Sequence, residues 1–479
     1  MVLMLNLKNI FGIDTRSLAA FRIGVATLLL SDLITRAGDL EAHYTDSGVL
    51  PRALLHDNIF YKWFLSIHTA NGSLEFQAFL FALAGVFALM LLVGYQTKLA
   101  TFVSWFLLIS LHTRNEMVLQ GGDVILRVVL FWSLFLQLGA CWSFDQRGRK
   151  NGGWTFLSAG STALLLQVAF VYWFSALHKR GISWSVDFTA LYYVLSIDQF
   201  ATDFGQWLLQ FPTLLKCLTA LTVGLEFVGP IIAFSPFATS KCRMTIVITF
   251  LLFHLGMAMA MDLGLFSYVC AVCWIPFIPG AFWEWILRPL PKSAASVERR
   301  VGKPALRWSV NTVVGVLLIY VFLWNLTTLD FSKYRKIFPK RIDCIGFVLR
   351  LDQHWNLFAP NPMVQDGWFV ISGTLRNGSQ VDLYKAGGKV SWEKPEEVRK
   401  TFKNRRWRKY LMKLYGDRDE DDLRHYSEYL CRCWNKNHQG EEIVGRLELD
   451  YMLEKTLPNY KTPKVEKVKI WSHECLAED

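Results

Sequence analysis

The chain has 479 residues, of which 52% are hydrophobic and 15% aromatic, and it carries a formal net charge of +11. This apolar content excludes an ordinary soluble domain and indicates a protein that crosses a membrane several times. The positive charge comes with no basic helix or RNA motif, so it favours loops that contact anionic lipid over a nucleic-acid site. The 19 Trp and 16 Tyr suit aromatic belts at the two membrane interfaces.

Nine apolar runs are candidates for membrane helices, which need ~20 residues to cross a hydrocarbon core of ~30 Å. They lie at about 17–34, 74–94, 100–111, 124–140, 156–177, 214–234, 244–261, 265–287 and 309–328. Arg22 and Asp32 fall in the first run, and Asp123 and Arg127 in the fourth. Charges in such places face protein, so we expect these four to pair and to stabilise a helical bundle.

Loop charge predicts how the bundle is oriented. Most basic loop residues fall on one side when the N-terminus is placed in the cytoplasm, namely Lys8, Arg16, Lys98, Arg147, Arg149, Lys150, Lys241, Arg243 and six more between 288 and 307. With nine spans, this bias predicts a cytoplasmic N-terminus and a C-terminus outside, in a membrane such as the bacterial inner membrane. Residues 1–17 hold too short an apolar run for a removable signal peptide.

Three connecting segments have recognisable patterns. Residues 43–68 contain an amphipathic stretch that suggests an interfacial segment at the outer mouth. Residues 147–154 read as a cytoplasmic turn, and 289–304 as a basic linker before the last span.

The chain changes character after Asp330, so we expect a membrane domain over 1–330 and a small extramembrane α+β domain over 331–479. Asn377-Gly378 between two apolar runs predicts a β-hairpin, and charged helices are expected at 395–415 and 421–434. Cys344, Cys431, Cys433 and Cys475 could form disulfides only in an oxidising compartment. We find no zinc-type cysteine spacing and no phosphate-binding loop, and expect no metal site.

One lysine stands at the end of a membrane run. Residues 167–184 read QVAFVYWFSALHKRGISW, which places Lys179 at a membrane boundary. An ammonium costs ~2.5–3.5 kcal/mol at mid-bilayer, so this lysine is paired, extended to the headgroups, or neutral for chemistry. Glu226 and His254 lie within other spans, and all three could converge on one cavity. Glu226 could equally be the structural partner of Lys179, Arg22 or Arg127, and His254 a satisfied core histidine.

Several separated segments resemble one known family. They are FRIG, LITRAGDLEAHYTDSGVLPRALL, YWFSALHKRGISW, GLEFVGP, FHLGMAMAMDLGLFSY and QHWNLFAPNP, in this order. They are similar to the membrane domain shared by vitamin K-dependent γ-glutamyl carboxylase and its bacterial relatives, the horizontally transferred transmembrane domain (HTTM) proteins. The resemblance runs to about Tyr384.

The resemblance implies a reaction and a set of residues. Lys179 matches the base that deprotonates vitamin K hydroquinone, with His178 beside it and Glu226 orienting or tuning it. His254, Trp173 and Met257 are the expected quinol-binding residues. The implied cofactor is a reduced naphthoquinone, with O2 and CO2 as co-substrates and no metal. A lysine base is physically reasonable because burial disfavours the ammonium and leaves an amine that accepts a phenolic proton.

The chain also departs from the carboxylase. His178 replaces the first of two adjacent lysines, and residues 112–123 lack an obvious counterpart of the assisting histidine, for which His112, Asn115 and Asp123 are the candidate substitutes. The C-terminal domain is smaller than the region that holds propeptide-bearing substrates. These departures keep open an alternative, a non-catalytic membrane module that binds a lipid, a peptide or a partner protein, as in toxin-peptide maturation or immunity. The expected partners are membrane lipid and a peptide or protein at the outer face.

Overall fold

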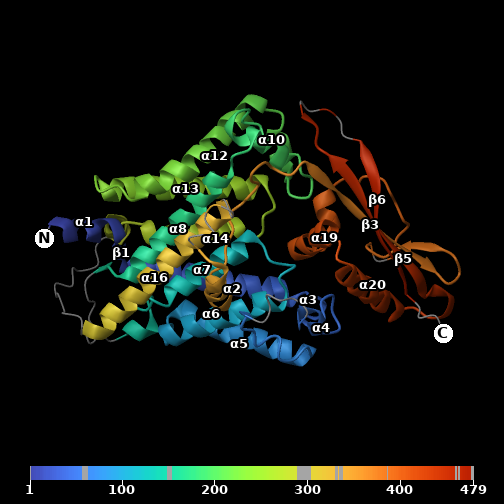
Figure 1. Ribbon diagram of the computed structural model, residues 1–479, viewed down its shortest axis with the longest axis horizontal. Coiled ribbons are helices and arrows are strands. Elements are labelled where there is room, and N and C mark those ends of the chain that lie inside the picture. Colours follow the sequence, from blue (N-terminus) through green and yellow to red (C-terminus); the bar gives the residue numbers. More distant parts are fainter. Residues whose placement is uncertain are drawn as a thin grey trace.

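The computed structural model describes residues 2–56, 63–147, 154–287, 304–329, 333, 338–385, 387–458, 461 and 464–475. The turn expected at 147–154, the basic linker at 289–304 and part of the amphipathic segment at 43–68 lie outside these residues. Figure 1 shows helices gathered into a bundle around the N-terminal two thirds of the chain, and a sheet near the C-terminus. Two helices, α19 (Arg405–Asp417) and α20 (Glu420–Asn435), lie between the bundle and the sheet.

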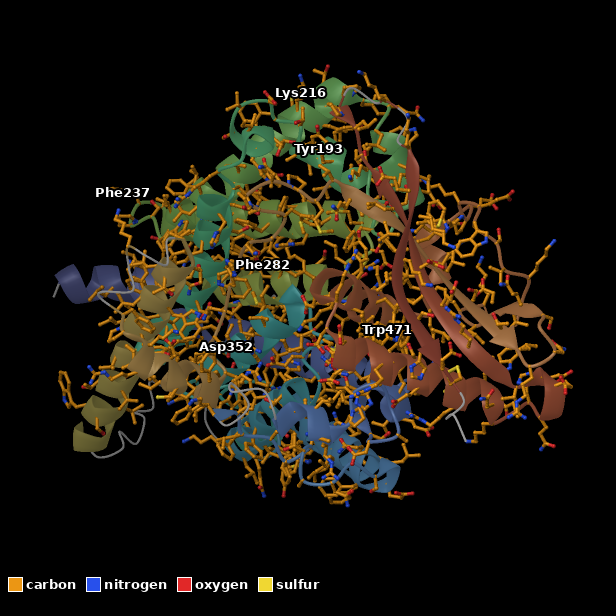
Figure 2. All side chains as sticks on the ribbon, turned by 45° about the vertical axis from the view of Figure 1, so that its right-hand side comes forward. Tyr193, Lys216, Phe237, Phe282, Asp352 and Trp471 are labelled. Carbon is orange, nitrogen blue, oxygen red and sulfur yellow. A yellow bond between two sulfur atoms is a disulfide. The ribbon has the colours of Figure 1, made fainter. Side chains whose placement is uncertain are left out.

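Six described helices are long and apolar enough to cross a membrane. They are α2 (Thr15–Ala37), α5 (Leu74–Val93), α8 (Ala159–His178), α12 (Pro212–Ala233), α13 (Thr239–Ala260) and α16 (Pro304–Leu329, of which 308–329 qualify). Figure 2 labels Lys216 near the start of α12 and Phe237 just beyond its end, at two well-separated edges of the molecule. These helices show that the protein is mainly helical, and their length and composition are consistent with a multi-pass membrane protein.

Shorter helices connect and flank the six. They are α1 (Val2–Phe11), α3 (Leu40–Tyr44), α4 (Arg52–His56), α6 (Thr97–Arg114), α7 (Gly121–Ser133), α9 (Ile182–Ser185), α10 (Ala190–Leu195), α11 (Asp203–Leu208), α14 (Phe266–Trp274), α15 (Gly280–Ile286) and α18 (Asp343–Leu349). A short strand pair, β1 (Ile13–Asp14) with β2 (Thr155–Phe156), ties the starts of α2 and α8 together.

The count of nine spans stays a prediction. Helices α6 and α7 form where two of the runs lie, but they are not among the six described helices that meet both the length and the hydropathy needed. The run at 265–287 is broken into α14 and α15, bent by 94°. Pro276 and Pro279 explain the break, because a proline lacks an N–H and disfavours helical geometry in the residue before it.

Local sequence signals set where the long helices begin and end. Helix α8 starts with a capping box, in which Ser158 and Ser161 satisfy each other's backbone N–H groups. Helix α12 starts with Pro212 in its first turn, where the missing N–H is no loss. Helix α5 ends at Gly94, whose φ of 73° is left-handed and suits glycine.

The C-terminal sheet has four antiparallel strands in the order β4-β3-β5-β6. The predicted hairpin is confirmed, with β3 (Gln365–Leu375) paired to β4 (Gln380–Asp382) and Gly378 in the turn at φ 83°. Strands β5 (Val444–Lys455) and β6 (Val465–Glu474) were not predicted. The two charged helices expected are present as α19 and α20. Helix α20 covers its expected range, whereas α19 starts only at Arg405.

The junction between the bundle and the C-terminal part is packed. Trp355 and Leu351, which follow α18, belong to the core of the bundle. The core of the C-terminal domain conversely takes in Val49 and Met117 from loops of the bundle. The boundary at residue 330 stays a prediction, and the chain beyond it is anchored to the bundle through buried apolar contacts.

Three of the four charges within the predicted runs pair as expected. Asp32 and Asp123 both bind Arg36 at 2.7 Å, and Arg127 binds Asp352 at 2.7 Å. The expectation was wrong for Arg22. Its guanidinium donates to the backbone carbonyls of Leu138, Cys141 and Trp142, so the turn after α7 satisfies it without a carboxylate among the described residues.

Candidate functional site

Lys179 caps the C-terminal end of α8 and turns its side chain inward. Its backbone N–H donates to the carbonyl of Ala176, which closes the last turn of the helix. Gly181 then lies against the loop at 360–361, donating to the Pro360 carbonyl at 2.9 Å. A Cβ there would fall 1.9 Å from Asn361 Oδ1, so only glycine allows this close approach. The chain after α8 is therefore held back against the bundle.

The ammonium of Lys179 is paired. Nζ donates to Glu226 Oε2 at 2.7 Å and to Ser175 Oγ at 2.6 Å, and the Trp184 ring centroid lies 5.1 Å away. The side chains of Lys179 and Glu226 are only 3% and 9% exposed. Of the three states considered for this lysine, the structure has the ion pair, and of the three partners considered for Glu226 it has Lys179 rather than Arg22 or Arg127.

A second polar group lies among the same helices. The Tyr172 hydroxyl and His254 Nε2 are 2.7 Å apart, and the Trp274 indole N–H donates to the same hydroxyl at 2.9 Å. His254 Nδ1 is buried and has no hydrogen-bond partner among the described residues. An imidazole nitrogen left without a partner in an apolar interior is costly, and a ligand that bonds to it would remove that cost.

These groups line one cavity of about 720 Å³. Its walls come from α8, α10, α12, α13 and α14, from the loop at 356–363, and from α19 of the C-terminal domain. The volume falls within the range of ~300–1,000 Å³ usual for small-molecule sites. Most of the walls are apolar, and the polar groups gather near Lys179 and along α19.

Four of the six predicted site residues line this cavity, and two do not. Lys179, Glu226, His254 and Met257 do. His178 points elsewhere, because its ring packs on His354 at 4.9 Å between centroids and its Nε2 lies 3.1 Å from Thr328 Oγ1. Trp173 donates its indole N–H to the Phe227 carbonyl, so it ties α8 to α12. Neither is among the described residues of the cavity wall.

No protein-family model, no curated protein and no solved structure matches this chain.

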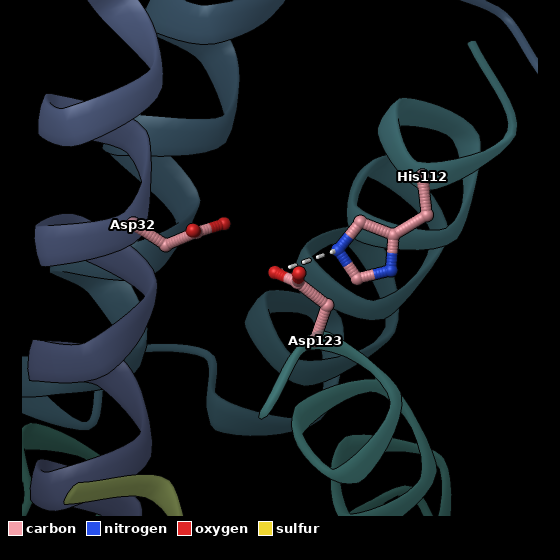
Figure 3. A group of neighbouring side chains, drawn as sticks. All are labelled: Asp32, His112 and Asp123. Carbon is pink, nitrogen blue, oxygen red and sulfur yellow. Dashed lines mark ion pairs between the residues drawn. The ribbon is translucent and has the colours of Figure 1, made fainter. Parts of the chain in front are cut away.

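The proposed substitutes for an assisting histidine lie outside the cavity. Asn115 holds the loops near it, with its amide donating to the His43 carbonyl and its Oδ1 accepting from the Met117 N–H. His112 and Asp123 belong to a different cluster with Asp32, drawn in Figure 3. None of the three is among the described residues that line the cavity around Lys179.

The cluster of Asp32, His112 and Asp123 has the composition of a metal site, but its carboxylates are occupied. Asp32 accepts from Arg36 on one oxygen and from Arg406 on the other. Asp123 accepts from Arg36 at 2.7 Å and from the Gln120 N–H at 2.7 Å. A metal ion would have to displace two buried guanidinium groups, so the cluster is better explained as an ion-pair network.

Sequence reasoning missed several residues of the cavity. Tyr172, Ser175 and Lys179 are spaced three and four apart on α8, so helical spacing alone could have placed them on one face. The cavity-lining residues of α19 gave no such signal, because they meet the bundle only through the tertiary fold.

Proposed function

We propose that this protein is a multi-pass membrane oxygenase of the carboxylase type, which binds a quinol in the cavity and uses Lys179 as the base. The observation that carries the proposal is the convergence of Lys179, Glu226 and His254, from three separate helices, on one cavity. A titratable group with a specific charged partner in a cleft is a recognised sign of a functional site.

The cavity fits a reduced naphthoquinone in size and chemistry. Its apolar walls suit a fused aromatic ring, and His254 Nδ1 is a polar atom in need of a partner. When bound, the quinol would supply the four electrons that reduce O2: two come from its conversion to the quinone, and two come from the ring double bond that takes up one oxygen atom as the epoxide, while the other oxygen leaves as water with the two quinol hydrogens. In the carboxylase-type reaction this oxidation drives deprotonation of a glutamate side chain, to which CO2 adds.

The residues of the chain have the following roles in this proposal. A proton passed from Lys179 Nζ to Glu226 converts the ion pair into a neutral amine and a neutral acid. Reaching this neutral state costs less free energy in a low-dielectric site than in water, because burial disfavours the charged forms. The amine then accepts a phenolic proton from the quinol. Ser175 orients Nζ, and the Tyr172 hydroxyl fixes His254 so that its other nitrogen is free for the ligand.

One observation favours the alternative, a non-catalytic binding module. Lys179 already has a carboxylate and a hydroxyl at hydrogen-bond distance, which is the arrangement of a structural ion pair. In that case the cavity would hold a lipid, a peptide or part of a partner protein without transforming it.

The experiment that separates the two uses protein in nanodiscs supplied with reduced naphthoquinones and O2, with epoxide detected by mass spectrometry. We expect wild type and Lys216→Ala, an exposed lysine of α12 outside the cavity lining, to form epoxide. Lys179→Ala and Lys179→Arg should not, because an arginine keeps the charge but supplies no free base. Epoxide from Lys179→Arg at the wild-type rate would refute the base assignment. If the quinol binds and no protein forms epoxide, the binding module is the better description.

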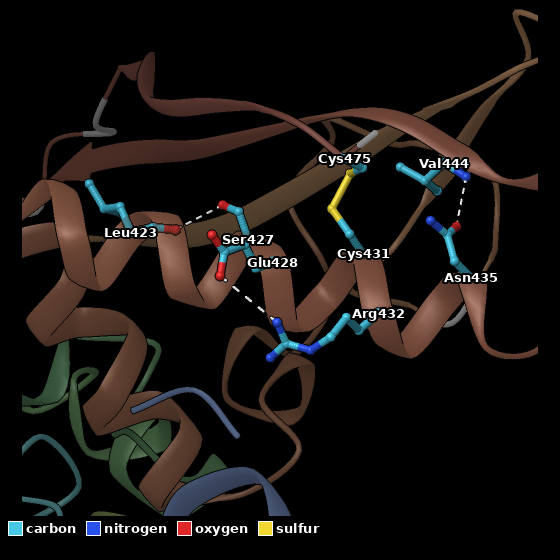
Figure 4. The surroundings of a disulfide bond; sticks show 8 residues. All are labelled: Leu423, Ser427, Glu428, Cys431, Arg432, Asn435, Val444 and Cys475. Carbon is cyan, nitrogen blue, oxygen red and sulfur yellow. Dashed lines mark hydrogen bonds and ion pairs between the residues drawn. A yellow bond between two sulfur atoms is a disulfide. The ribbon is translucent and has the colours of Figure 1, made fainter. Parts of the chain in front are cut away.

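We also propose that the C-terminal domain faces an oxidising compartment, as a cytoplasmic N-terminus with nine spans requires. Cys431 on α20 and Cys475, directly after β6, form a disulfide, and Figure 4 shows it joining helix to sheet. Disulfides persist in secreted and periplasmic domains and are rare in the cytosol. Cys433 is a free, exposed thiol on the same helix. A membrane-impermeant maleimide should label it in intact spheroplasts, and Cys433→Ser should lose that labelling. Labelling of Cys433 only after lysis would show that the C-terminal domain faces the cytoplasm.

A further inference from the structure

The part of the cavity formed by α19 has a chemistry of its own, and we call it the cavity mouth: Arg408, Lys409, Met412, Lys413, Gly416 and Asp417. These residues recur every four positions and so share one side of the helix. We propose that the cavity binds an anionic amphiphile, with its charged head group on Lys409 and Lys413 and its apolar body between the membrane helices. This inference goes beyond the proposed function, since it needs the cavity and not the quinol chemistry.

The two lysines of the cavity mouth lack partners. Within the described part of the chain, neither ammonium has a hydrogen bond or a carboxylate oxygen within 4.0 Å. The neighbouring cations of α19 differ, because Arg405 is paired with Asp262 and Arg406 with Asp32. A pair of lysines left without counter-ions at the edge of a cavity is suited to an anion that comes from outside the chain.

The other charged groups of the cavity mouth do not supply that anion. Arg408 donates to the backbone carbonyls of Gln199 at 2.5 Å and Asp262 at 2.8 Å, so it is already held. Asp417 lies one turn beyond Lys413 and forms no ion pair with it. Burial, followed by the charge of Lys413, lowers the pKa of Lys409, while Asp417 acts in the opposite direction. A bound anion would relieve the repulsion between the two lysines.

The remainder of the cavity suits a hydrocarbon body. Val171, Leu191, Val194, Phe253, Met257 and Phe266 line it. Helices α12 and α13 contribute to this wall and also carry outward apolar residues, such as Leu221 at 65% and Leu252 at 62% exposure. The same two helices therefore present apolar residues both to the cavity and to the outer surface. A ligand with a charged end at α19 and an apolar end in the bundle matches both parts.

The test uses full-length protein in phosphatidylcholine nanodiscs at pH 8 and three probes. Oleate carries both features, oleyl alcohol has the chain without the charge, and acetate or inorganic phosphate has the charge without the chain. We expect oleate to bind wild type, and the double variant Lys409→Gln/Lys413→Gln to bind it at least about tenfold more weakly, because charge-assisted hydrogen bonds are lost. Oleyl alcohol should bind weakly and equally to both proteins, and the small anions should not compete.

A matched control removes two charges elsewhere. Lys389→Gln/Lys436→Gln changes two exposed lysines of the same domain that lie outside the cavity lining, and should bind oleate as wild type does. Thermal unfolding of each variant checks that the fold is kept. Equal oleate affinity in wild type and the Lys409/Lys413 variant would overturn the proposal, as would equal affinity of wild type for oleyl alcohol. If inorganic phosphate competed with oleate, the proposal of an amphiphilic ligand would be wrong, and a small anion would be the better ligand. None of these outcomes changes the epoxide test.

Discussion

At the scale of single residues, Lys179 and Glu226 place two opposite charges in the interior of the protein. Both side chains are nearly inaccessible, so each charge depends on the other for compensation. A buried pair is often no better for stability than two apolar residues, yet removing one partner leaves an unpaired charge. Such a pair is retained at a cost, which is the reason to look for a function in it.

The first prediction concerns the stability of this pair. Glu226→Leu or Lys179→Met alone should lower the free energy of unfolding by ~3–5 kcal/mol, because the remaining charge is left buried. The double change Lys179→Met/Glu226→Leu should be less destabilised than the sum of the two single changes. Unfolding by denaturant in micelles measures all four proteins. Additive losses would show that the two groups do not interact.

The second prediction concerns Asp366 in β3, outside the membrane helices. Burial and the nearby charge of Asp198 raise the pKa of Asp366 to about 7, while the N–H of Gly367 and that of Asp198 act in the opposite direction. The group binds its proton more tightly when folded, so its contribution to stability is present below about pH 4 and is lost as the pH rises to about 7.

Asp366→Asn should therefore have the same free energy of unfolding as wild type at pH 4 and a higher one at pH 8, by on the order of 4 kcal/mol, since each pKa unit corresponds to about 1.4 kcal/mol. Denaturant titrations of both proteins at the two pH values make the comparison. Asp198→Asn is a control that removes the neighbouring charge and keeps the backbone N–H that bonds to Asp366, and Lys394, which pairs with Asp198 at 2.7 Å, keeps Glu454 as its partner. If wild type gained stability over the variant with rising pH, the raised pKa would be wrong.

At the scale of elements, the C-terminal domain is held by the disulfide and by the docking of its helices. Helix α20 is preceded by its N-cap residue Asp419, whose side chain accepts hydrogen bonds from the backbone N–H groups of Asp421 and Asp422. The disulfide from Cys431 to Cys475 lies near the other end of the helix. This bond closes a loop over 44 positions, including both unpredicted strands. It therefore limits the freedom of the unfolded chain where helix and sheet must meet.

The third prediction follows from that loop. Cys475→Ser should lower the free energy of unfolding of the C-terminal domain by ~2–4 kcal/mol, and a reductant should have the same effect on wild type. Far-UV circular dichroism in urea, with and without dithiothreitol, measures both. Cys433→Ser is the matched control, since Cys433 is free. A reductant that left the wild-type transition unchanged would show that the bond does not contribute.

At the scale of the whole molecule, Arg406 couples the two parts. It extends from α19 into the bundle, between Asp32 of α2 and Asp123 of α7. Arg36 alone would leave these two carboxylates with one counter-charge. The bundle and the C-terminal domain therefore share an ion-pair network, and their relative position depends on it.

The fourth prediction tests this coupling. Arg406→Met should release α19 from the bundle and make the C-terminal domain more sensitive to protease, with a loss of ~3–5 kcal/mol typical of a broken buried pair. Arg376→Met, at an exposed arginine in the hairpin turn, should behave as wild type. Limited proteolysis of both variants in nanodiscs makes the comparison. Equal cleavage rates would show that the other contacts of α19, such as the pair of Arg405 with Asp262, hold the domain without Arg406.

The sequence predicted those features that local patterns encode. Apolar runs located the long helices, and Asn377-Gly378 located the hairpin. It did not predict β6, because charged residues such as Lys467 and Lys469 obscure the pattern of a strand at the edge of the sheet. It also did not predict β5, a central strand whose sequence holds Arg446, Glu448 and Asp450 between its apolar residues. Proximity of Lys179 to Glu226 was one option among several, since partners 47 residues apart are chosen by helix packing. The position of the α19 lysines at the cavity could not be predicted for the same reason.

The contacts of Arg406 also determine when the buried carboxylates gain their second partner during synthesis. Asp32 precedes it by 374 residues and Asp123 by 283, so both carboxylates leave the ribosome long before their second guanidinium exists. A nascent chain that stops short of α19 keeps an excess negative charge inside its helices, where charge is costly. The helices that carry Asp32 and Asp123 therefore reach a balanced charge only after α19 has been synthesised and has packed against them.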